Sequence, residues 1–227
     1  MRTSKLWSIF LAFSGVIFIL AFSIALPIWL RFFYYIQIDA LDIENYSGFT
    51  REQIITAYNE VLDYLNFGTP FGTGELLYSE SGKSHFEDCK VLFDLDTWAL
   101  VISGVVLITA LVLKKCKVLK PKKLAKFDWF FFSGLFSVIV PIVLGVAVAV
   151  DFENAFVVFH KIFFPGKENW QFNWYEDEII RILPAEFFMR CAIFIAVALL
   201  LLSITCIVIG IINRKKLKGI EKHIAEI

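Results

Sequence analysis

The stretch Phe187–Ile212 reads FFMRCAIFIAVALLLLSITCIVIGII and is almost entirely apolar. A helix needs about 20 such residues to cross a bilayer. Two further runs, Leu6–Phe33 and Phe127–Val150, reach this length, whereas Trp98–Leu113 must be extended upstream to residue 94. We therefore predict an all-α membrane protein with four transmembrane helices, over about residues 6–33, 94–113, 127–150 and 187–212.

The composition of the whole chain agrees with this fold class. Of the 227 residues, 58% are hydrophobic, and the mean hydropathy is +0.70, far above that of an ordinary soluble chain. The first run is too long for a signal-peptide core and lacks a small-residue cleavage site, so we do not expect its cleavage. We predict a single membrane domain over residues 1–227.

The charges divide the connecting segments into two kinds. Lysines crowd residues 114–126 and the tail after Ile212, and Arg2 and Lys5 precede the first run, whereas residues 34–93 and 151–186 are rich in acids. Because positive loops face the cytoplasm, we place both termini inside and the two acidic segments outside. The middles of the spans carry no Asp, Glu or Lys, which argues against ion-coupled transport, and we expect no nucleic-acid partner.

The first outer segment contains Tyr78–Asp88, YSESGKSHFED. Ser84 and Glu87 form the capping-box pattern S-x-x-E, so we expect Ser84 to be the N-cap and His85 the first residue of a helix. The helix dipole would then keep His85 neutral. The alternative is a capped surface helix whose histidine sits in water. Either this helix runs straight into the second span, or it breaks near residues 96–97.

Short amphipathic helices are predicted in both outer segments. Thr50–Gln53 is a second capping-box pattern, followed by apolar residues at helical spacing that end at Gly68. In the other outer segment, residues 152–164 carry phenylalanines on one stripe with His160 at its edge, and residues 176–183 suit another short helix. We expect the helix after Thr50 to lie on the membrane or on the helix bundle, and residues 152–164 to form a short interfacial or re-entrant helix.

His85 and His160 are thus both expected at headgroup depth, beside carboxylates. Such groups suit acid–base chemistry on a lipid ester. No G-x-S-x-G motif is present, so a serine acyl-enzyme is not supported. The pattern of His85-x-x-Asp88 with a distant His160 is weak for zinc, and we expect neither metal nor cofactor. Whether Cys89 and Cys191 pair is left open.

The chain resembles the bacterial lipoprotein intramolecular transacylases (Lit), four-span membrane proteins with both termini inside. The motifs that carry the resemblance are Ser79-Glu80, Ser84-His85-x-x-Asp88 and Phe159-His160-x-x-Phe163-Phe164, followed by Trp170 and Asp177. The resemblance implies an acyltransferase that moves the sn-2 acyl chain of a diacylglyceryl lipoprotein onto the α-amino group of its N-terminal cysteine. The product is a lyso-form lipoprotein.

The residues accommodate this reaction without an acyl-enzyme, because nucleophile and ester belong to one substrate. We expect His85 to act as base, oriented by Asp88, and His160 to polarise the ester or protonate the leaving oxygen, although the two roles can be exchanged. Residues expected to bind substrate are Ser84, Glu80, Trp170 and Asp177.

Two other classes of function remain open at this stage. One is a non-enzymatic membrane scaffold or lipid-binding subunit, and the other is a zinc-dependent membrane hydrolase. The acyltransferase interpretation predicts a monomer in the bacterial cell membrane with its active site at the outer leaflet. Its partners are the diacylglyceryl lipoprotein and membrane lipids.

Overall fold

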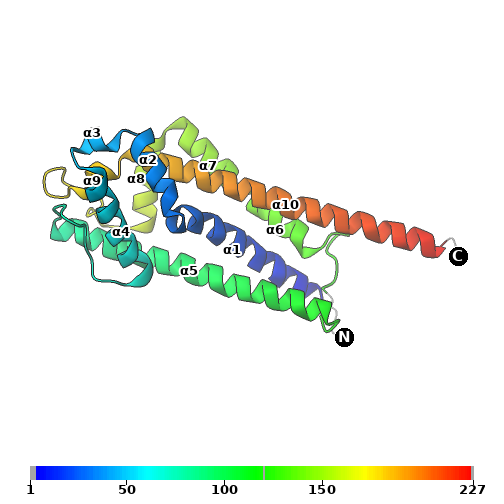
Figure 1. Cartoon of the computed structure of the whole chain (residues 1–227). Helices are drawn as coiled ribbons and strands as arrows, with labels where there is room; N and C mark the ends of the chain where they lie inside the picture. The colour runs from blue at the N-terminus through cyan, green and yellow to red at the C-terminus, as the bar shows by residue number, and fades with distance from the viewer. Residues whose placement is uncertain (1–3, 120, 226–227) are drawn as a thin grey trace. The chain divides into compact units, whose positions relative to one another are not determined.

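Helices make up nearly all of the regular structure in the computed structural model, which describes residues 4–119 and 121–225 (Figure 1). Within these residues there is no β-strand beyond one isolated bridge between Leu124 and Phe127. The helices are α1 (Lys5–Trp29), α2 (Arg31–Ala40), α3 (Ile43–Ser47), α4 (Arg51–Phe67), α5 (Glu80–Lys115), α6 (Trp129–Ser137), α7 (Ile139–Val150), α8 (Phe152–Phe163), α9 (Ile179–Ile182) and α10 (Ala185–Ala225).

Four helical segments in the described part of the chain are long and apolar enough to cross a membrane. They are Lys5–Trp29, Glu80–Lys115, Trp129–Ala147 and Ala185–Lys216. The predicted fold class, an all-α membrane protein with four spans, is confirmed.

Two of the predicted spans are interrupted. The first helix ends at Trp29, and Leu30 caps a separate helix α2, so the predicted end at residue 33 is wrong. Proline lacks the N–H that continues a helix, and Pro27 lies in the last turn of α1. The third span is divided at Val138, between α6 and α7. Pro141, in the first turn of α7, offers no N–H to the carbonyl of Ser137.

Helix α5 is continuous, which decides between the two alternatives for the segment that carries His85. It has 36 residues, or about 54 Å at 1.5 Å per residue, whereas a bilayer core is about 30 Å thick. Its first half, residues 80–97, is charged in every turn, and its second half is apolar. The second half is therefore the part of α5 that is apolar enough to span a bilayer, whereas the half that carries His85 is charged.

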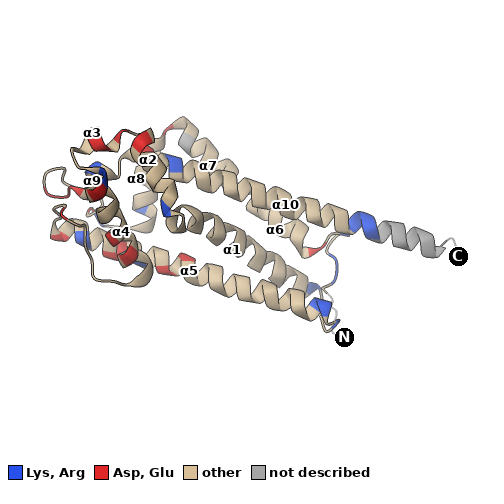
Figure 2. Ribbon diagram, in the orientation of Figure 1, with Lys and Arg blue, Asp and Glu red and all other residues tan. Residues whose placement is uncertain are grey.

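The chain divides into two compact units. One, the spanning unit, comprises Met1–Ile24, Trp98–Leu144 and Ile195–Ile227, and the other, the site unit, comprises Ala25–Thr97 and Gly145–Phe194. In the spanning unit Gly134 lies so close to α10 that an added Cβ would be 2.3 Å from the Ser203 carbonyl oxygen. Small residues permit such close helix packing in membranes. Figure 2 shows lysines and arginines on the end of α5, on the hairpin after it and on α10.

The site unit has a core of its own. Its buried side chains come from α2, α3, α4, α5, α9 and α10, together with Leu76 and Leu183. Tyr34 is fully buried at its centre, stacks on Tyr58 with ring centroids 3.8 Å apart, and donates a hydrogen bond of 2.6 Å to the Ile182 carbonyl. The predicted capping box of α4 is confirmed, with Thr50 as N-cap and Gly68 closing the helix at a φ of 69°. This core includes Phe86 and so supports α5, the helix that carries His85.

Candidate active site

The start of α5 lies one turn earlier than predicted. Ser79 precedes the helix, and its Oγ accepts a hydrogen bond of 2.9 Å from the backbone N–H of Gly82. The prediction that Ser84 caps the helix and that His85 is its first residue is therefore wrong. His85 lies in the second turn of α5, where the dipole of the helix end acts on it less strongly.

Asp177 explains why Ser79 is the cap. The Asp177 side chain is only 2% exposed. Its Oδ1 accepts hydrogen bonds of 2.8 Å from both the backbone N–H and the hydroxyl of Ser79, and its Oδ2 accepts one of 3.1 Å from the Asn173 N–H. A Cβ at Gly82 would be 2.3 Å from Oδ1, so the approach requires glycine. This carboxylate joins the first turn of α5 to the segment before α9.

His160 is presented by α8, the predicted helix of the second acidic segment. Asp151 caps this helix by accepting a hydrogen bond of 3.0 Å from the Asn154 N–H. His160 Nδ1 lies 2.7 Å from the carbonyl oxygen of Phe156, one turn earlier. A carbonyl oxygen only accepts, so Nδ1 carries the hydrogen, and in the neutral ring Nε2 has the free lone pair.

The structure brings His85 and His160 together. Their ring centroids are 5.7 Å apart, and each side chain is 6% exposed. Aromatic rings surround the pair. Phe164 and Phe172 meet the His85 ring edge to face at 5.0 and 5.5 Å, and Trp170 stacks on the His160 ring at 4.6 Å. Two histidines 75 residues apart in the chain therefore share one buried aromatic site.

Burial keeps both imidazoles neutral at pH 7. It lowers the pKa of His85 to about 4. Electrostatic interaction with His160 lowers this pKa further, the charge of Asp88 raises it, and the charge of Lys167 lowers it by a smaller amount. Burial also lowers the pKa of His160, against the opposing effect of its hydrogen bond to Phe156. A neutral imidazole both accepts and donates a proton, as acid–base catalysis requires. The neutral His85 that we expected from the helix dipole is instead a consequence of desolvation.

Asp88 does not contact His85 by any hydrogen bond among the described residues. Its Oδ1 pairs with Lys167 Nζ, and its Oδ2 accepts a hydrogen bond of 3.0 Å from Asn169. Burial alone would raise the pKa of Asp88, but the hydrogen bonds and charge of Lys167, with Asn169 and His85, lower it on balance. Asp88 instead fastens the loop after α8 to α5, and its influence on His85 is that of a nearby charge.

The four residues expected to bind substrate lie in different surroundings. Trp170 covers His160, and Ser84 is half-buried and accepts a hydrogen bond of 3.4 Å from Asn169. Glu80 is exposed and pairs only loosely with Lys83, at 3.9 Å. Both carboxylate oxygens of Asp177 already accept hydrogen bonds from Ser79 and Asn173. Trp170 and Ser84 are thus next to the histidines or their loop, whereas Asp177 holds the framework of the site.

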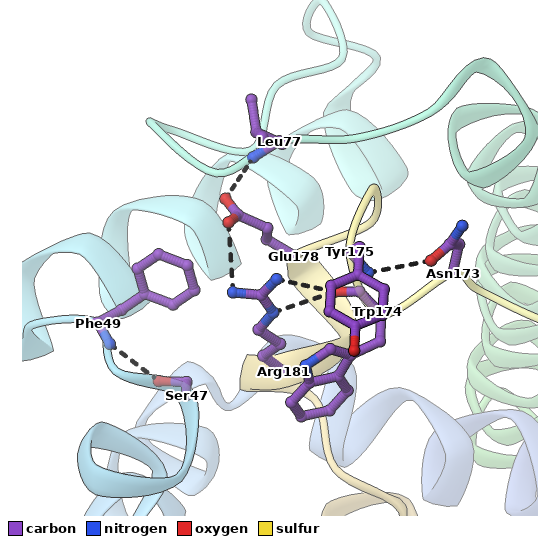
Figure 3. A network of polar contacts seen from close by, with 8 residues as sticks. All are labelled: Ser47, Phe49, Leu77, Asn173, Trp174, Tyr175, Glu178 and Arg181. Atoms are coloured by element: carbon purple, nitrogen blue, oxygen red, sulfur yellow. Dashed lines mark hydrogen bonds and ion pairs between the residues drawn. The ribbon is translucent and has the colours of Figure 1, made fainter.

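The loop after α8 is also held at its far end (Figure 3). Arg181 of α9 donates two hydrogen bonds, of 2.9 and 3.1 Å, to the Trp174 carbonyl and pairs with Glu178 at 3.3 Å. Glu178 in turn accepts a hydrogen bond of 2.9 Å from the Leu77 N–H, just before α5. Residues 164–178 are therefore attached at both ends, which holds Trp170 over His160.

Lys167, Asn169 and Cys89 belong to this site, although the sequence predicted no role there for the two loop residues and indicated Cys89 only as a possible partner of Cys191. Lys167 and Asn169 follow the Pro165-Gly166 turn and precede Trp170. Their position, between a turn that ends a helix and an interfacial tryptophan, was the sequence pattern that could have indicated them as site residues. Cys89 Sγ lies 3.4 Å from His85 Nε2. All four cysteines are free thiols, so Cys89 and Cys191 do not pair.

The described residues contain no group of three or more histidine, cysteine, aspartate or glutamate side chains able to hold a metal ion together. Around the histidine pair the neighbours are aromatic rings, a thiol and an amide. The Cys89 thiol is within hydrogen-bonding distance of the His85 ring, and the His160 ring lies beside it. The two imidazoles are therefore neutral and largely desolvated neighbours.

The chain is similar in sequence and in structure to known proteins. In sequence, an uncharacterized protein of Aquifex aeolicus (strain VF5) is 27% identical over 146 residues, 64% of this chain. The match spans 62% of that relative, less than two thirds of its length. In structure, the membrane integral lipoprotein intramolecular transacylase Lit from Bacillus cereus, solved in meso, matches with a TM-score of 0.82 at 26% identity, covering 95% of this chain and 97% of that one.

The same B. cereus protein with a histidine-to-alanine mutation matches with a TM-score of 0.76 at 26% identity, over 95% of each chain. The family model described as lipoprotein intramolecular transacylase Lit matches residues 9–188 of this chain. That match covers well over half of the sequence and includes both histidines of the site. The protein is therefore a member of the lipoprotein intramolecular transacylase (Lit) family.

Proposed function

We propose that this protein is a membrane acyltransferase that converts diacylglyceryl lipoproteins to the lyso form. The sn-2 acyl chain of the glyceryl group moves to the α-amino group of the N-terminal cysteine of the same lipoprotein. Family membership supports the reaction class. The observation that carries the mechanism is the pair of buried, neutral imidazoles with ring centroids 5.7 Å apart.

The tautomer of His160 favours His160 as the base. With its Nδ1–H donated to the Phe156 carbonyl, Nε2 is the atom able to accept the proton of the attacking amine. The amine nitrogen forms a bond to the sn-2 ester carbonyl carbon, and its proton passes to Nε2. His85 then donates a hydrogen bond to the carbonyl oxygen, on which negative charge develops. This assignment exchanges the two roles that we first expected.

Collapse of the tetrahedral intermediate completes the transfer. The bond between the carbonyl carbon and the sn-2 glyceryl oxygen breaks, and the proton held by His160 returns to that oxygen. An amide and a free hydroxyl result, so atoms and protons balance without an acyl-enzyme. Because both reacting groups belong to one molecule, correct folding of the substrate supplies much of the rate, up to about 7–11 kcal/mol of the barrier.

The surroundings of the pair suit a lipid-anchored substrate. Helix α8 exposes Phe159, Ile162 and Phe163 on the side away from the core, as expected of a helix that meets acyl chains. The basic hairpin 114–126 and the acidic segments support cytoplasmic termini and a site at the outer leaflet. The protein would act as a monomer in the bacterial cell membrane, with lipoproteins and membrane lipids as its partners.

Mass spectrometry of a lipoprotein's N-terminal peptide tests the proposal. The protein is expressed in a host whose lipoproteins keep a free α-amino group. We expect an N-acyl cysteine with a lyso-glyceryl group, and its loss in His85→Ala and His160→Ala variants of equal abundance. An unchanged diacylglyceryl peptide with the wild-type protein would favour a scaffold or lipid-binding role. Zinc at one equivalent in the purified protein would instead favour the hydrolase.

A further inference from the structure

Cys89 lies one helical turn after His85 on the same face of α5. Its Sγ is 3.4 Å from His85 Nε2, within hydrogen-bonding range for sulfur. The other ring nitrogen, Nδ1, is buried and has no hydrogen-bond partner among residues 4–119 and 121–225. Because buried polar atoms in proteins are nearly always paired, an unpartnered nitrogen in a reactive site is available to a substrate atom.

The thiol of Cys89 is protonated at physiological pH. Burial, with a smaller contribution from the charge of Asp88, raises its pKa to about 12. A thiolate is the reactive form of cysteine, so this side chain is not suited to be a nucleophile. As a neutral thiol it has one hydrogen to donate.

The direction of the contact follows from the acceptor strengths. An imidazole nitrogen is a good acceptor, whereas a thiol sulfur is a weak one, so Sγ–H donates to Nε2. The charged or titratable groups that act on His85 are His160 from α8, Lys167 from the loop after it and Asp88 on its own helix. None of them forms a hydrogen bond to the ring, so the thiol is its only hydrogen-bond partner among the described residues.

We infer that Cys89 is a positioning residue that holds the hydrogen of the neutral His85 ring on Nδ1, by donating its own thiol hydrogen to Nε2. A hydrogen bond at one imidazole nitrogen selects the tautomer at the other. The inference rests on the proposed function, in which His85 is the hydrogen-bond donor to the ester carbonyl. It assigns that donation to Nδ1–H.

Two substitutions separate hydrogen bonding from packing. Cys89→Ala removes the donor, and Cys89→Ser keeps one at nearly the same place. Cys191→Ala is the matched control, because Cys191 is another partly buried thiol packed against the same core, on α10. Initial rates of lyso-lipoprotein formation by the purified proteins give kcat and KM for each. Nitrogen-15 NMR of histidine-labelled protein reports the tautomer, and the chain has only three histidines to assign.

We expect Cys89→Ala to lower kcat by about 10-fold with little change in KM, the scale seen when partners that orient histidines are removed elsewhere. The His85 ring signals should change from the Nδ1-protonated form to a mixture of tautomers. Cys89→Ser should recover most of the activity and the tautomer, and Cys191→Ala should resemble the wild type.

An unaltered kcat and unaltered ring signals in Cys89→Ala would overturn the inference. So would a serine variant as defective as the alanine variant, since that outcome indicates packing. Failure of the proposed function looks different, because the wild-type protein would then form no lyso-lipoprotein, or His85→Ala would retain full activity. If His85→Ala loses activity and Cys89→Ala keeps it, the proposed function stands and only the role of Cys89 is rejected.

Discussion

Trp170 lies stacked on His160, with ring centroids 4.6 Å apart and planes inclined by 27°. The indole N–H donates a hydrogen bond of 3.0 Å to the Lys167 carbonyl, and the Lys167 side chain pairs with Asp88 of α5. The same loop therefore covers one histidine and is fastened beside the other. Desolvation of the histidine pair depends on this loop remaining in place.

The histidine pair should behave as one unit. His85→Ala and His160→Ala should each reduce lyso-lipoprotein formation by about 100-fold or more, the usual scale for acid–base groups. The double variant should lose little beyond either single one, because residues that act together are not additive. His223, whose side chain lies outside the described residues, provides the control: His223→Ala should retain activity. Additive losses in the double variant would contradict joint action.

The pH dependence of kcat should reflect the lowered pKa values of both histidines. The active form has neutral rings, and burial moves their protonation below the ordinary histidine pKa of about 6.5. We therefore expect kcat to stay level from pH 8 down to about 6.5 and to fall only at lower pH. Measurements at saturating lipoprotein check this. A midpoint above 7 would show that at least one ring is not desolvated in the complex.

The pair formed by Asp88 and Lys167 should act by holding the loop. Asp88→Asn and Lys167→Met should each lower activity by about 10-fold, less than loss of a histidine, because the chemical groups remain. A double-mutant cycle should show strong coupling, since both variants break the same contact. Lys161→Met, at an exposed lysine on α8, is the matched control. Independent effects of the two changes would indicate separate roles.

Asp177 should be needed for stability rather than for substrate binding. Asp177→Ala removes the acceptor of three part-buried hydrogen bonds from Ser79 and Asn173, which costs about 1–3 kcal/mol. The melting temperature in detergent should fall, and activity per folded molecule should fall less. Glu176→Ala, at an exposed acid one residue earlier, should leave the melting temperature unchanged. A stable but inactive Asp177→Ala protein would support the substrate-binding role that we first expected.

The predicted topology is testable with one native and one introduced thiol. Cys116 is exposed on the lysine hairpin, and Ser81→Cys adds a thiol at an exposed position on the first turn of α5. In intact cells a membrane-impermeant maleimide should label Ser81→Cys and spare Cys116, which should react only after lysis. The reverse pattern would place the site on the cytoplasmic side and reject the outer-leaflet location.

The hydrophobic runs alone determined the fold class, because a span of about 20 apolar residues has few alternatives to a transmembrane helix. Local patterns also sufficed for α4 and α8, whose caps are made within a few residues. His85 and His160 were recognisable as rare polar groups beside apolar stripes. The interruption at Leu30 was less visible, because Pro27 allows a kinked helix as well as a broken one.

Only the tertiary structure decided how α5 begins and what Asp88 does. Ser84-x-x-Glu87 fits the capping-box pattern, yet the helix begins after Ser79. Asp177, 98 residues further along the chain, binds Ser79 and fixes the helix start there. Asp88 is at the right spacing for His85, yet Lys167 and Asn169 occupy both of its oxygens. A local sequence pattern cannot predict such competition between hydrogen-bond partners. The partner that is bound in the structure belongs to a distant segment, which packing of the site unit brings close. Each histidine ring has one partner on its own helix, Cys89 for His85 and Phe156 for His160. The burial that keeps both rings neutral comes instead from the tertiary packing.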